Sequence, residues 1–145
     1  MDRPSLYSFM SKYRYGVVSS TSGTGSPQSA LVGIATTPDL EIIFDTVASS
    51  RKYPNLIERP RCSFVVGWGT EQTVQFEGTA ILPKGPDLKR YQDAYFAIWP
   101  ECRTHINWPD IAYFVVRPAW IRFSDYDQNP PLIEEMTFEI SQERT

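Results

Sequence analysis

The chain lacks the features that identify several large classes of protein. It has 145 residues, with 14 Lys and Arg against 17 Asp and Glu, so its net charge is −3. A nucleic-acid-binding protein usually carries a basic surplus, and no run of Lys and Arg here exceeds two residues. No stretch approaches the ~20 apolar residues of a membrane helix, and the N-terminus has no signal-peptide pattern. We therefore expect a cytoplasmic protein that binds neither nucleic acid nor membrane.

Cysteine and histidine are also scarce. The chain has Cys62, Cys102 and a single histidine, His105, with no C-x-x-C pair. A zinc site needs more ligands at tighter spacing, so we expect no metal site and two free thiols. His105 falls on an irregular stretch, where a surface or hinge position is expected and a place in a ligand pocket is the alternative.

Apolar and aromatic residues are plentiful enough to form one hydrophobic core. They make up 41% and 14% of the chain, and this length fits a single domain. We expect one domain over residues 1–145, with an N-terminal helix within 1–14, a barrel over 15–125 and an acidic tail over 126–145.

Alternating apolar residues and turn signals predict a series of strands. Two helices are predicted between them, a serine-capped one over 49–58 and another at about 87–99, and a weak strand is predicted over 136–140. A proline inside the last long segment, Pro118, indicates an edge, a bulge or a bend. Short connections favour an antiparallel sheet closed into a barrel. The six main strands are predicted at 15–21, 28–36, 40–46, 61–68, 72–82 and 111–123.

The segment 44–56 carries the clearest chemistry in the chain. It leads a predicted strand into a helix start containing Ser49 and Ser50, followed by the adjacent cations Arg51 and Lys52. The first turn of a helix has free backbone N–H groups, and an Arg fork beside a Lys charge can hold a phosphate there. Spacing alone favours a plainer interpretation, in which serine caps the helix and the two cations are solvated.

Several stretches follow one another in the order found in a known family. In chain order they are YGVVSST, GSPQSALVGIATTPD, LEIIFDT, SSRKYPNLIERPRCSFVVGW, QTVQFEGTAILPKG and IAYFVVRPAWIRFSDYD. Over about Tyr15 to Asp127 the chain resembles the pyridoxamine 5'-phosphate oxidase-like FMN-binding split barrels, most specifically in Ser-Arg-Lys-x-x-Asn-Leu. The resemblance implies a mainly β (α+β) fold, a six-stranded antiparallel split β-barrel with a few peripheral helices.

The resemblance also implies a cofactor and its contacts. In this family the Arg-Lys pair after the third strand grips the FMN phosphate, the end of that strand and the start of the fifth contact the flavin, and the closing strand approaches the partner subunit's flavin. It implies a homodimeric, FMN-dependent oxidoreductase with its cofactor at the interface and a small-molecule substrate. The residues implied as cofactor-binding are Phe44, Asp45, Thr46, Ser49, Ser50, Arg51, Lys52, Gln72, Thr73 and Trp120.

Two departures from the family pattern separate this chain from true pyridoxamine phosphate oxidases. Those enzymes carry an arginine and a lysine on the second strand, where this chain has Ala30 and Ala35, and they end in a substrate-binding segment that is replaced here by the acidic tail. We therefore expect a flavin site without vitamin B6 oxidase activity. For Trp120, a core position beside a surface Arg122 is the alternative to a flavin contact.

Two other functions remain open at this point. One is a deazaflavin-dependent reductase of the same fold, and the other is a non-catalytic barrel that binds flavin, heme or no ligand.

Overall fold

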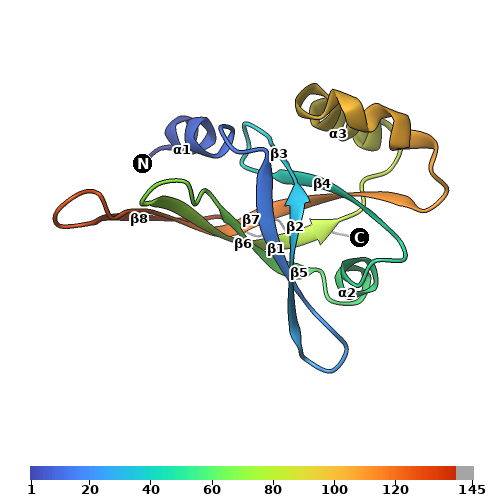
Figure 1. Cartoon of the computed structure of the whole chain (residues 1–145), viewed down its shortest axis with the longest axis horizontal. Coiled ribbons are helices and arrows are strands. Elements are labelled where there is room, and N and C mark those ends of the chain that lie inside the picture. The colour runs from blue at the N-terminus through green and yellow to red at the C-terminus, as the bar shows by residue number, and fades with distance from the viewer. Residues whose placement is uncertain (140–145) are drawn as a thin grey trace.

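A single curled antiparallel sheet organises the chain, with helices around it (Figure 1). The computed structural model describes residues 1–139. Its strands follow the order β2-β1-β5-β6-β7-β4-β3, and β8 pairs with β7. The strands are β1 (Tyr15–Thr21), β2 (Pro27–Gly33), β3 (Ala35–Thr36), β4 (Ile42–Val47), β5 (Arg61–Val66), β6 (Gln72–Ile81), β7 (Ile111–Asp125) and β8 (Leu132–Thr137).

The mainly β, half-barrel architecture is confirmed, but residues 1–139 contain eight strands where six were predicted. The predicted strand 28–36 is divided in two because Ile34 leaves the ladder, and its backbone N–H donates to the Arg14 carbonyl at 2.8 Å. The eighth strand, β8, forms inside the expected tail. The weak strand predicted at 136–140 therefore lies too late in the chain, and residue 140 is outside the described residues.

The long strand β7 joins the two halves of the sheet. Its first half pairs with β4 and its second half with β8, while β6 runs along its other edge. The register between β6 and β7 shifts at Glu77/Gly78, where Gly78 faces Pro118. Of the three possibilities that Pro118 indicated, the structure shows the bulge, which lets one strand serve both halves.

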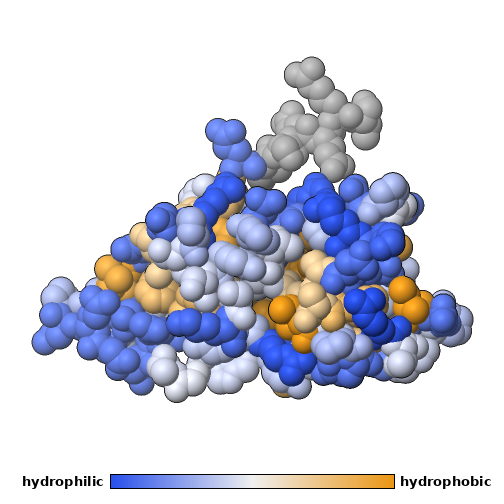
Figure 2. Space-filling view, turned by 90° about the horizontal axis from the view of Figure 1, so that it is seen from above, coloured by the Kyte–Doolittle hydropathy of each residue, from blue (hydrophilic) through white to orange (hydrophobic). Residues whose placement is uncertain are grey.

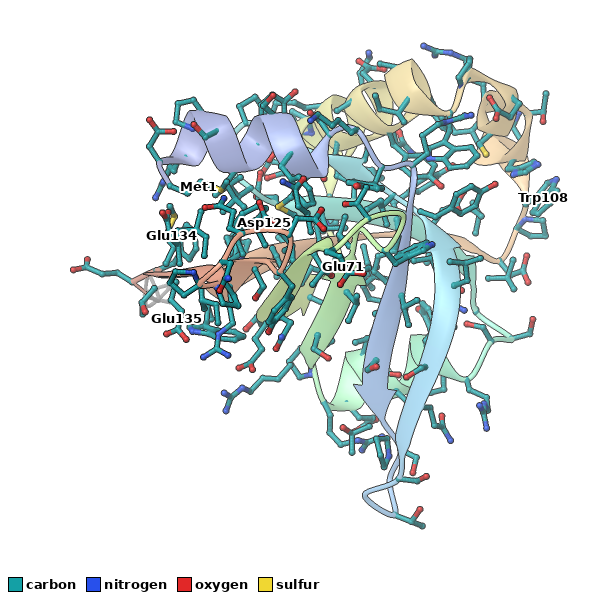
Figure 3. All side chains as sticks on the ribbon, turned by 60° about the vertical axis from the view of Figure 1, so that its left-hand side comes forward. Met1, Glu71, Trp108, Asp125, Glu134 and Glu135 are labelled. Atoms are coloured by element: carbon teal, nitrogen blue, oxygen red, sulfur yellow. The ribbon has the colours of Figure 1, made fainter. Side chains whose placement is uncertain are left out.

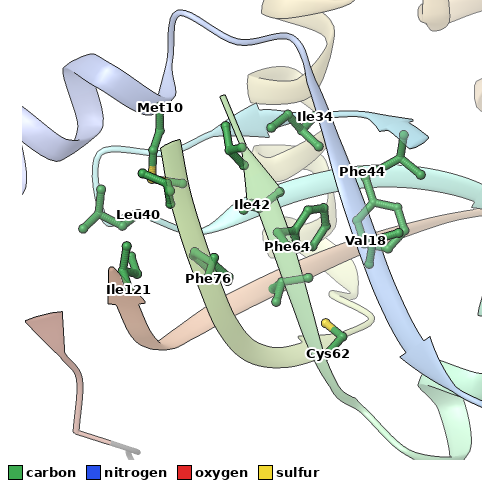
Figure 4. Packing of buried hydrophobic residues seen from close by; sticks show 14 of the residues in the cluster. Met10, Val18, Ile34, Leu40, Ile42, Phe44, Cys62, Phe64, Phe76 and Ile121 are labelled. Carbon is green, nitrogen blue, oxygen red and sulfur yellow. The ribbon is translucent and has the colours of Figure 1, made fainter. Parts of the chain in front are cut away.

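Two hydrophobic layers lie on opposite faces of β4. The side chains of alternate residues, including Ile42 and Phe44, point into the main core shown in Figure 4. The other, including Ile43, packs under α3 (Gly85–Ile98) against Tyr95 and Trp99. The strand is therefore apolar on both faces, which follows from the two-residue period of a β-strand with a layer on each side.

The helices lie close to their predicted positions, with one correction. Helix α1 (Arg3–Met10) is capped by Asp2, whose carboxylate accepts from the Ser5 N–H at 2.9 Å. Helix α2 (Lys52–Glu58) begins later than predicted, with Arg51 at its N-cap position and no side-chain cap. The predicted serine cap is wrong, since the Ser50 hydroxyl instead lies 2.9 Å from the Thr46 hydroxyl.

A 3-10 segment, η1 (Pro100–Asn107), occupies the stretch that the sequence indicated to be irregular. Both cysteines are free, and Cys62 is buried in the core, where burial raises its pKa to about 12. Within residues 1–139, none of the helices has the length and apolar character needed to cross a membrane.

The bulge gives a sharp test of the sheet. A Cβ at Gly78 would stand 2.2 Å from the Arg117 carbonyl oxygen, whereas one at Gly23 would meet nothing within 4 Å. Because the added Cβ would meet a backbone atom, which no side-chain rotation can move away, we expect Gly78→Ala to lower the free energy of unfolding by about 2 kcal/mol or more. Urea unfolding should show this loss, and Gly23→Ala should leave the midpoint nearly unchanged. Equal midpoints for the two variants would contradict the bulge geometry.

Candidate functional site

A small pocket lies between the β1–β2 hairpin and the start of α2, which are neighbours in Figure 1. We call it the Arg51–Lys52 pocket, and its volume is about 100 Å³. None of its lining residues within 1–139 is a carboxylate, so the pocket presents hydroxyl, amide and cationic groups. Its lining residues are Val18, Ser20, Gln28, Ser29, Ala30, Arg51 and Lys52.

A buried asparagine holds one wall of this pocket in place. Asn55 donates to the Ser20 hydroxyl at 3.1 Å and to the Gln28 side-chain oxygen at 3.0 Å. Ser20 and Gln28 are direct cross-strand partners in the β1–β2 ladder. Because the Gln28 oxygen accepts from Asn55, its amide NH₂ is left as a donor without a partner among residues 1–139.

The two cations supply the other wall. Within residues 1–139, neither the Arg51 nor the Lys52 side chain has a hydrogen-bond or ion-pair partner, unlike Arg14, which pairs with Glu101 at 2.9 Å. Burial lowers the pKa of Lys52, and the charge of Asp45 opposes that shift. Two cations held beside neutral donors, with no carboxylate in the pocket itself, form an arrangement suited to an anion.

Strand β4, which leads into this pocket, points its predicted cofactor contacts in different directions. Phe44 is fully buried and stacks on Phe114 with ring centroids 5.5 Å apart. Its ring fills the core, so only the backbone of Phe44 is available to a flavin, and this contact stays a prediction. Thr46 points to the same side and is buried against Ser50, whereas Asp45 points to the opposite side. Ser49 is exposed and has no side-chain hydrogen bond within residues 1–139.

Asp45 belongs instead to a cluster on the outer side of β4, under α3 and η1. The ligand atoms of Asp45, Cys102 and His105 lie within 4.8 Å of one another. One Asp45 oxygen accepts from the Tyr95 hydroxyl at 3.3 Å, and the other is buried with no partner among residues 1–139. Tyr113, the cross-strand neighbour of Asp45, also has a buried hydroxyl that lacks a partner in this described part of the chain. We call these five residues the Asp45 cluster.

The charge on Asp45 is disfavoured in this setting. Burial raises the pKa of Asp45, against the hydrogen bond from Tyr95 and the charges of His105 and Lys52. Burial and the nearby Asp45 charge raise the pKa of Tyr113 to about 12. Burial likewise raises the pKa of Cys102, aided by Asp45 and Glu101.

The remaining predicted contacts lie far from the Arg51–Lys52 pocket within one chain. Gln72 and Thr73 start β6, at the end of the sheet where Gln72 donates to Asp125 at 3.0 Å. Figure 3 places Asp125 on the opposite side of the molecule from Trp108, which stacks on His105. The opposite end of β6, near Thr79, is the end closer to α2. The length of the strand therefore separates Gln72 and Thr73 from the α2 region by roughly 20 Å.

Trp120 lies on the β7–β8 ribbon, also away from the pocket. Its ring N–H donates to Glu135 at 3.4 Å, and Arg122 bonds the same carboxylate at 2.8 Å. Trp120 is therefore a half-exposed member of a surface network and not a core residue, and its contact with a partner subunit's flavin stays a prediction.

The sequence prediction missed Ser20, Gln28 and Ser29 in the pocket, and Tyr95 in the Asp45 cluster. One available signal was the run of polar residues in two adjacent predicted strands, since a hairpin places Ser19 opposite Ser29 and Ser20 opposite Gln28. No local signal links Tyr95 with Asp45, because α3 must first pack on β4.

Comparison with known proteins gives a family and a fold. The sequence profile described as pyridoxamine 5'-phosphate oxidase matches residues 4–125. A search of curated proteins found no match. The heme binding protein from Mycobacterium smegmatis superposes with a TM-score of 0.80 at 16% identity, over 94% of this chain and 58% of that one. The chain thus spans less than two thirds of that protein.

Two other solved structures match over nearly their whole length. The conserved hypothetical protein Rv2991 from Mycobacterium tuberculosis has a TM-score of 0.73 at 24% identity, with 97% of this chain and 94% of that one covered. A pyridoxamine 5'-phosphate oxidase-related, FMN binding protein from Nostoc punctiforme has a TM-score of 0.68 at 11% identity, with 94% and 95% covered. At these identities the likeness shows a shared fold.

The raised pKa of Asp45 predicts how the stability of the fold depends on pH. A raised pKa in the folded state means that folding favours the protonated acid, so stability falls as the pH rises through that pKa. Asp45→Asn is neutral at every pH and can still accept from Tyr95. We expect it to raise the melting temperature at neutral pH, with the gain disappearing below 3.8, the ordinary pKa.

Thermal unfolding across this pH range, in the presence of a chelator, measures the effect. Asp110→Asn is the matched control, because Asp110 is exposed and should change stability little at any pH. A loss of stability in Asp45→Asn at neutral pH would show that the charged carboxylate is favoured by the fold.

Proposed function

Since the chain belongs to the pyridoxamine 5'-phosphate oxidase family, we propose that it is an FMN-binding oxidoreductase whose Arg51 and Lys52 hold the cofactor phosphate. The observation that carries the proposal is the Arg51–Lys52 pocket. Its two cations have no ion-pair partner within residues 1–139, and no acidic side chain lines it.

The donor set fits a phosphate monoester. A phosphate offers several acceptor oxygens and a negative charge, and the pocket offers a guanidinium fork, an ammonium and the free amide of Gln28. Asn55 fixes Gln28 before any ligand arrives, which reduces the entropy cost of binding. Ala30, at the same pocket, adds no charge, so the site has two cations where the family's true oxidases have more.

FMN supplies two-electron chemistry when bound, so this chain needs no nucleophile of its own. The role of its residues is to bind the phosphate, orient the cofactor and surround it. A single chain surrounds it poorly, because Gln72, Thr73 and Trp120 lie at the other end of the sheet. These three residues would reach a flavin only from a second copy of the chain.

A homodimer is therefore part of the proposal. Leu31, Val17 and Val65 stand in register across β2, β1 and β5. They form an apolar row whose outer members, Leu31 and Val65, are 61% and 42% exposed. Figure 2 shows the surface from above, where apolar residues lie among hydrophilic ones. Apolar rows of this kind are typical of subunit interfaces.

Two alternatives use the same fold. A deazaflavin would place its own phosphate in the pocket, and heme has support from the likeness to the Mycobacterium smegmatis protein. Both can be separated from FMN by the absorption spectrum of the purified protein and by mass analysis of the released cofactor.

The two unpaired thiols support a reducing, cytoplasmic location.

Removing the two cations tests the phosphate assignment. A charge-assisted hydrogen bond contributes about 1.5–3 kcal/mol, so Arg51→Ala and Lys52→Ala should each weaken FMN binding by about tenfold or more. Quenching of FMN fluorescence on titration measures the dissociation constant. The variants Lys12→Ala and Lys84→Ala each remove one charge from an exposed site away from the pocket and should bind FMN like the parent. Equal affinity in all variants would refute the assignment.

A single charge on the apolar row tests the dimer. Leu31→Lys should convert a dimer into a monomer of 16.6 kDa, because burying an unpaired ammonium at an interface is costly. Sedimentation equilibrium distinguishes the two states. Ile57→Lys is the control, since Ile57 is also exposed but lies on α2. A monomeric parent, or a dimeric Leu31→Lys variant, would contradict this interface.

A further inference from the structure

The Asp45 cluster is a second polar site, built on the opposite side of β4 from the core. Three side chains of different metal-ligating types converge in it, with all ligand atoms within 4.8 Å of one another. Asp45 comes from β4, and Cys102 and His105 come from η1, whose first residues follow directly on α3. The site therefore joins an internal strand to the segment that covers it.

Two buried polar atoms in the cluster have no partner within residues 1–139. They are one carboxylate oxygen of Asp45 and the hydroxyl of Tyr113. Tyr113 is only 4% exposed and lies opposite Asp45 in the β4–β7 ladder. Buried polar atoms are normally paired, because leaving one unpaired costs about 1–3 kcal/mol. These two atoms lie beside a thiol and an imidazole, so a cation held there would give the free Asp45 oxygen a partner.

From this geometry we infer that Asp45, Cys102 and His105 bind a divalent transition metal ion of the zinc type. A thiolate, an imidazole and a carboxylate form a ligand set that Zn²⁺ and Co²⁺ accept. Ligand atoms around one tetrahedral zinc lie roughly 3–4 Å apart, as follows from bond lengths near 2.0–2.3 Å, so a small closure of the cluster suffices. Three protein ligands leave the fourth position to water.

The surroundings suit a cation better than a nucleophilic cysteine. A reactive thiolate needs a lowered pKa, but burial, Asp45 and Glu101 all raise the pKa of Cys102. A bound cation would neutralise Asp45 and take the thiol proton's place. His105 is already oriented, because its ring stacks on Trp108 with centroids 4.0 Å apart.

Cobalt provides the direct test, because a thiolate bound to Co²⁺ gives a charge-transfer absorption band. The full chain is stripped with a chelator, desalted and titrated with CoCl₂, and the cobalt is then displaced with ZnCl₂. We expect one Co²⁺ per chain, with a charge-transfer band that Zn²⁺ abolishes. The band should be absent in Cys102→Ser and present in Cys62→Ala, in which the other thiol is removed.

The two remaining ligands are tested by affinity. His105→Gln and Asp45→Asn should each weaken Zn²⁺ binding by about tenfold or more, measured by competition with a chromophoric chelator. His105 makes no side-chain hydrogen bond within residues 1–139, so its variant should fold normally. Asp45→Asn should also lose the rise in melting temperature that Zn²⁺ gives the parent.

Several results would overturn the inference. These are no charge-transfer band at one Co²⁺ per chain, the same band in Cys102→Ser, or unchanged zinc affinity in His105→Gln. The variant Arg51→Ala should bind Zn²⁺ like the parent, because Arg51 is not a ligand; Lys52 is left in place, since its charge acts on Asp45. Loss of FMN and loss of zinc are thus separate outcomes, and either proposal can fail alone.

Discussion

The alternation of side chains along β4 is the constraint on which the rest of the molecule depends. Every second residue enters the barrel, so Phe44 stacks in the core and Thr46 is buried on the same side. The residues between them face α3, which brings Asp45 to Tyr95. A shift of one residue would turn the carboxylate into the core and Phe44 toward α3. The six-residue pairing of β4 with β7 holds this register.

This alternation gives the molecule two chemically different sites next to each other. As β4 ends, the chain turns into α2 and presents Arg51 and Lys52 to the β1–β2 hairpin, where Asn55 has fixed Gln28. On the other face, Asp45 is enclosed by aromatic residues and η1. One site is cationic and open to an anion, while the other is acidic and suited to a cation. Their charges interact, since Asp45 affects the pKa of Lys52.

The sequence predicted the main strands well because a two-residue period and turn residues are local properties, and β1 begins and ends where predicted. It failed where both faces of a strand are apolar. Ile42 and Ile43 are both buried, so the pattern could not show that Phe44 points inward. It also could not assemble the Asp45 cluster, because Cys102 meets Asp45 only after α3 folds over the sheet. Spacing along the chain detects only ligands that are close in sequence, so it cannot detect a group that forms by tertiary contacts, as Asp45 does with Cys102 and His105.

The central claim is that the Arg51–Lys52 pocket recognises a flavin by its phosphate. Its most direct test compares FMN with riboflavin, which has the same ring and ribityl chain without the phosphate, by titrating each into the unmodified protein. The account predicts that FMN binds at least about tenfold more tightly, and that inorganic phosphate competes with FMN far better than with riboflavin. Equal affinities for FMN and riboflavin would contradict it.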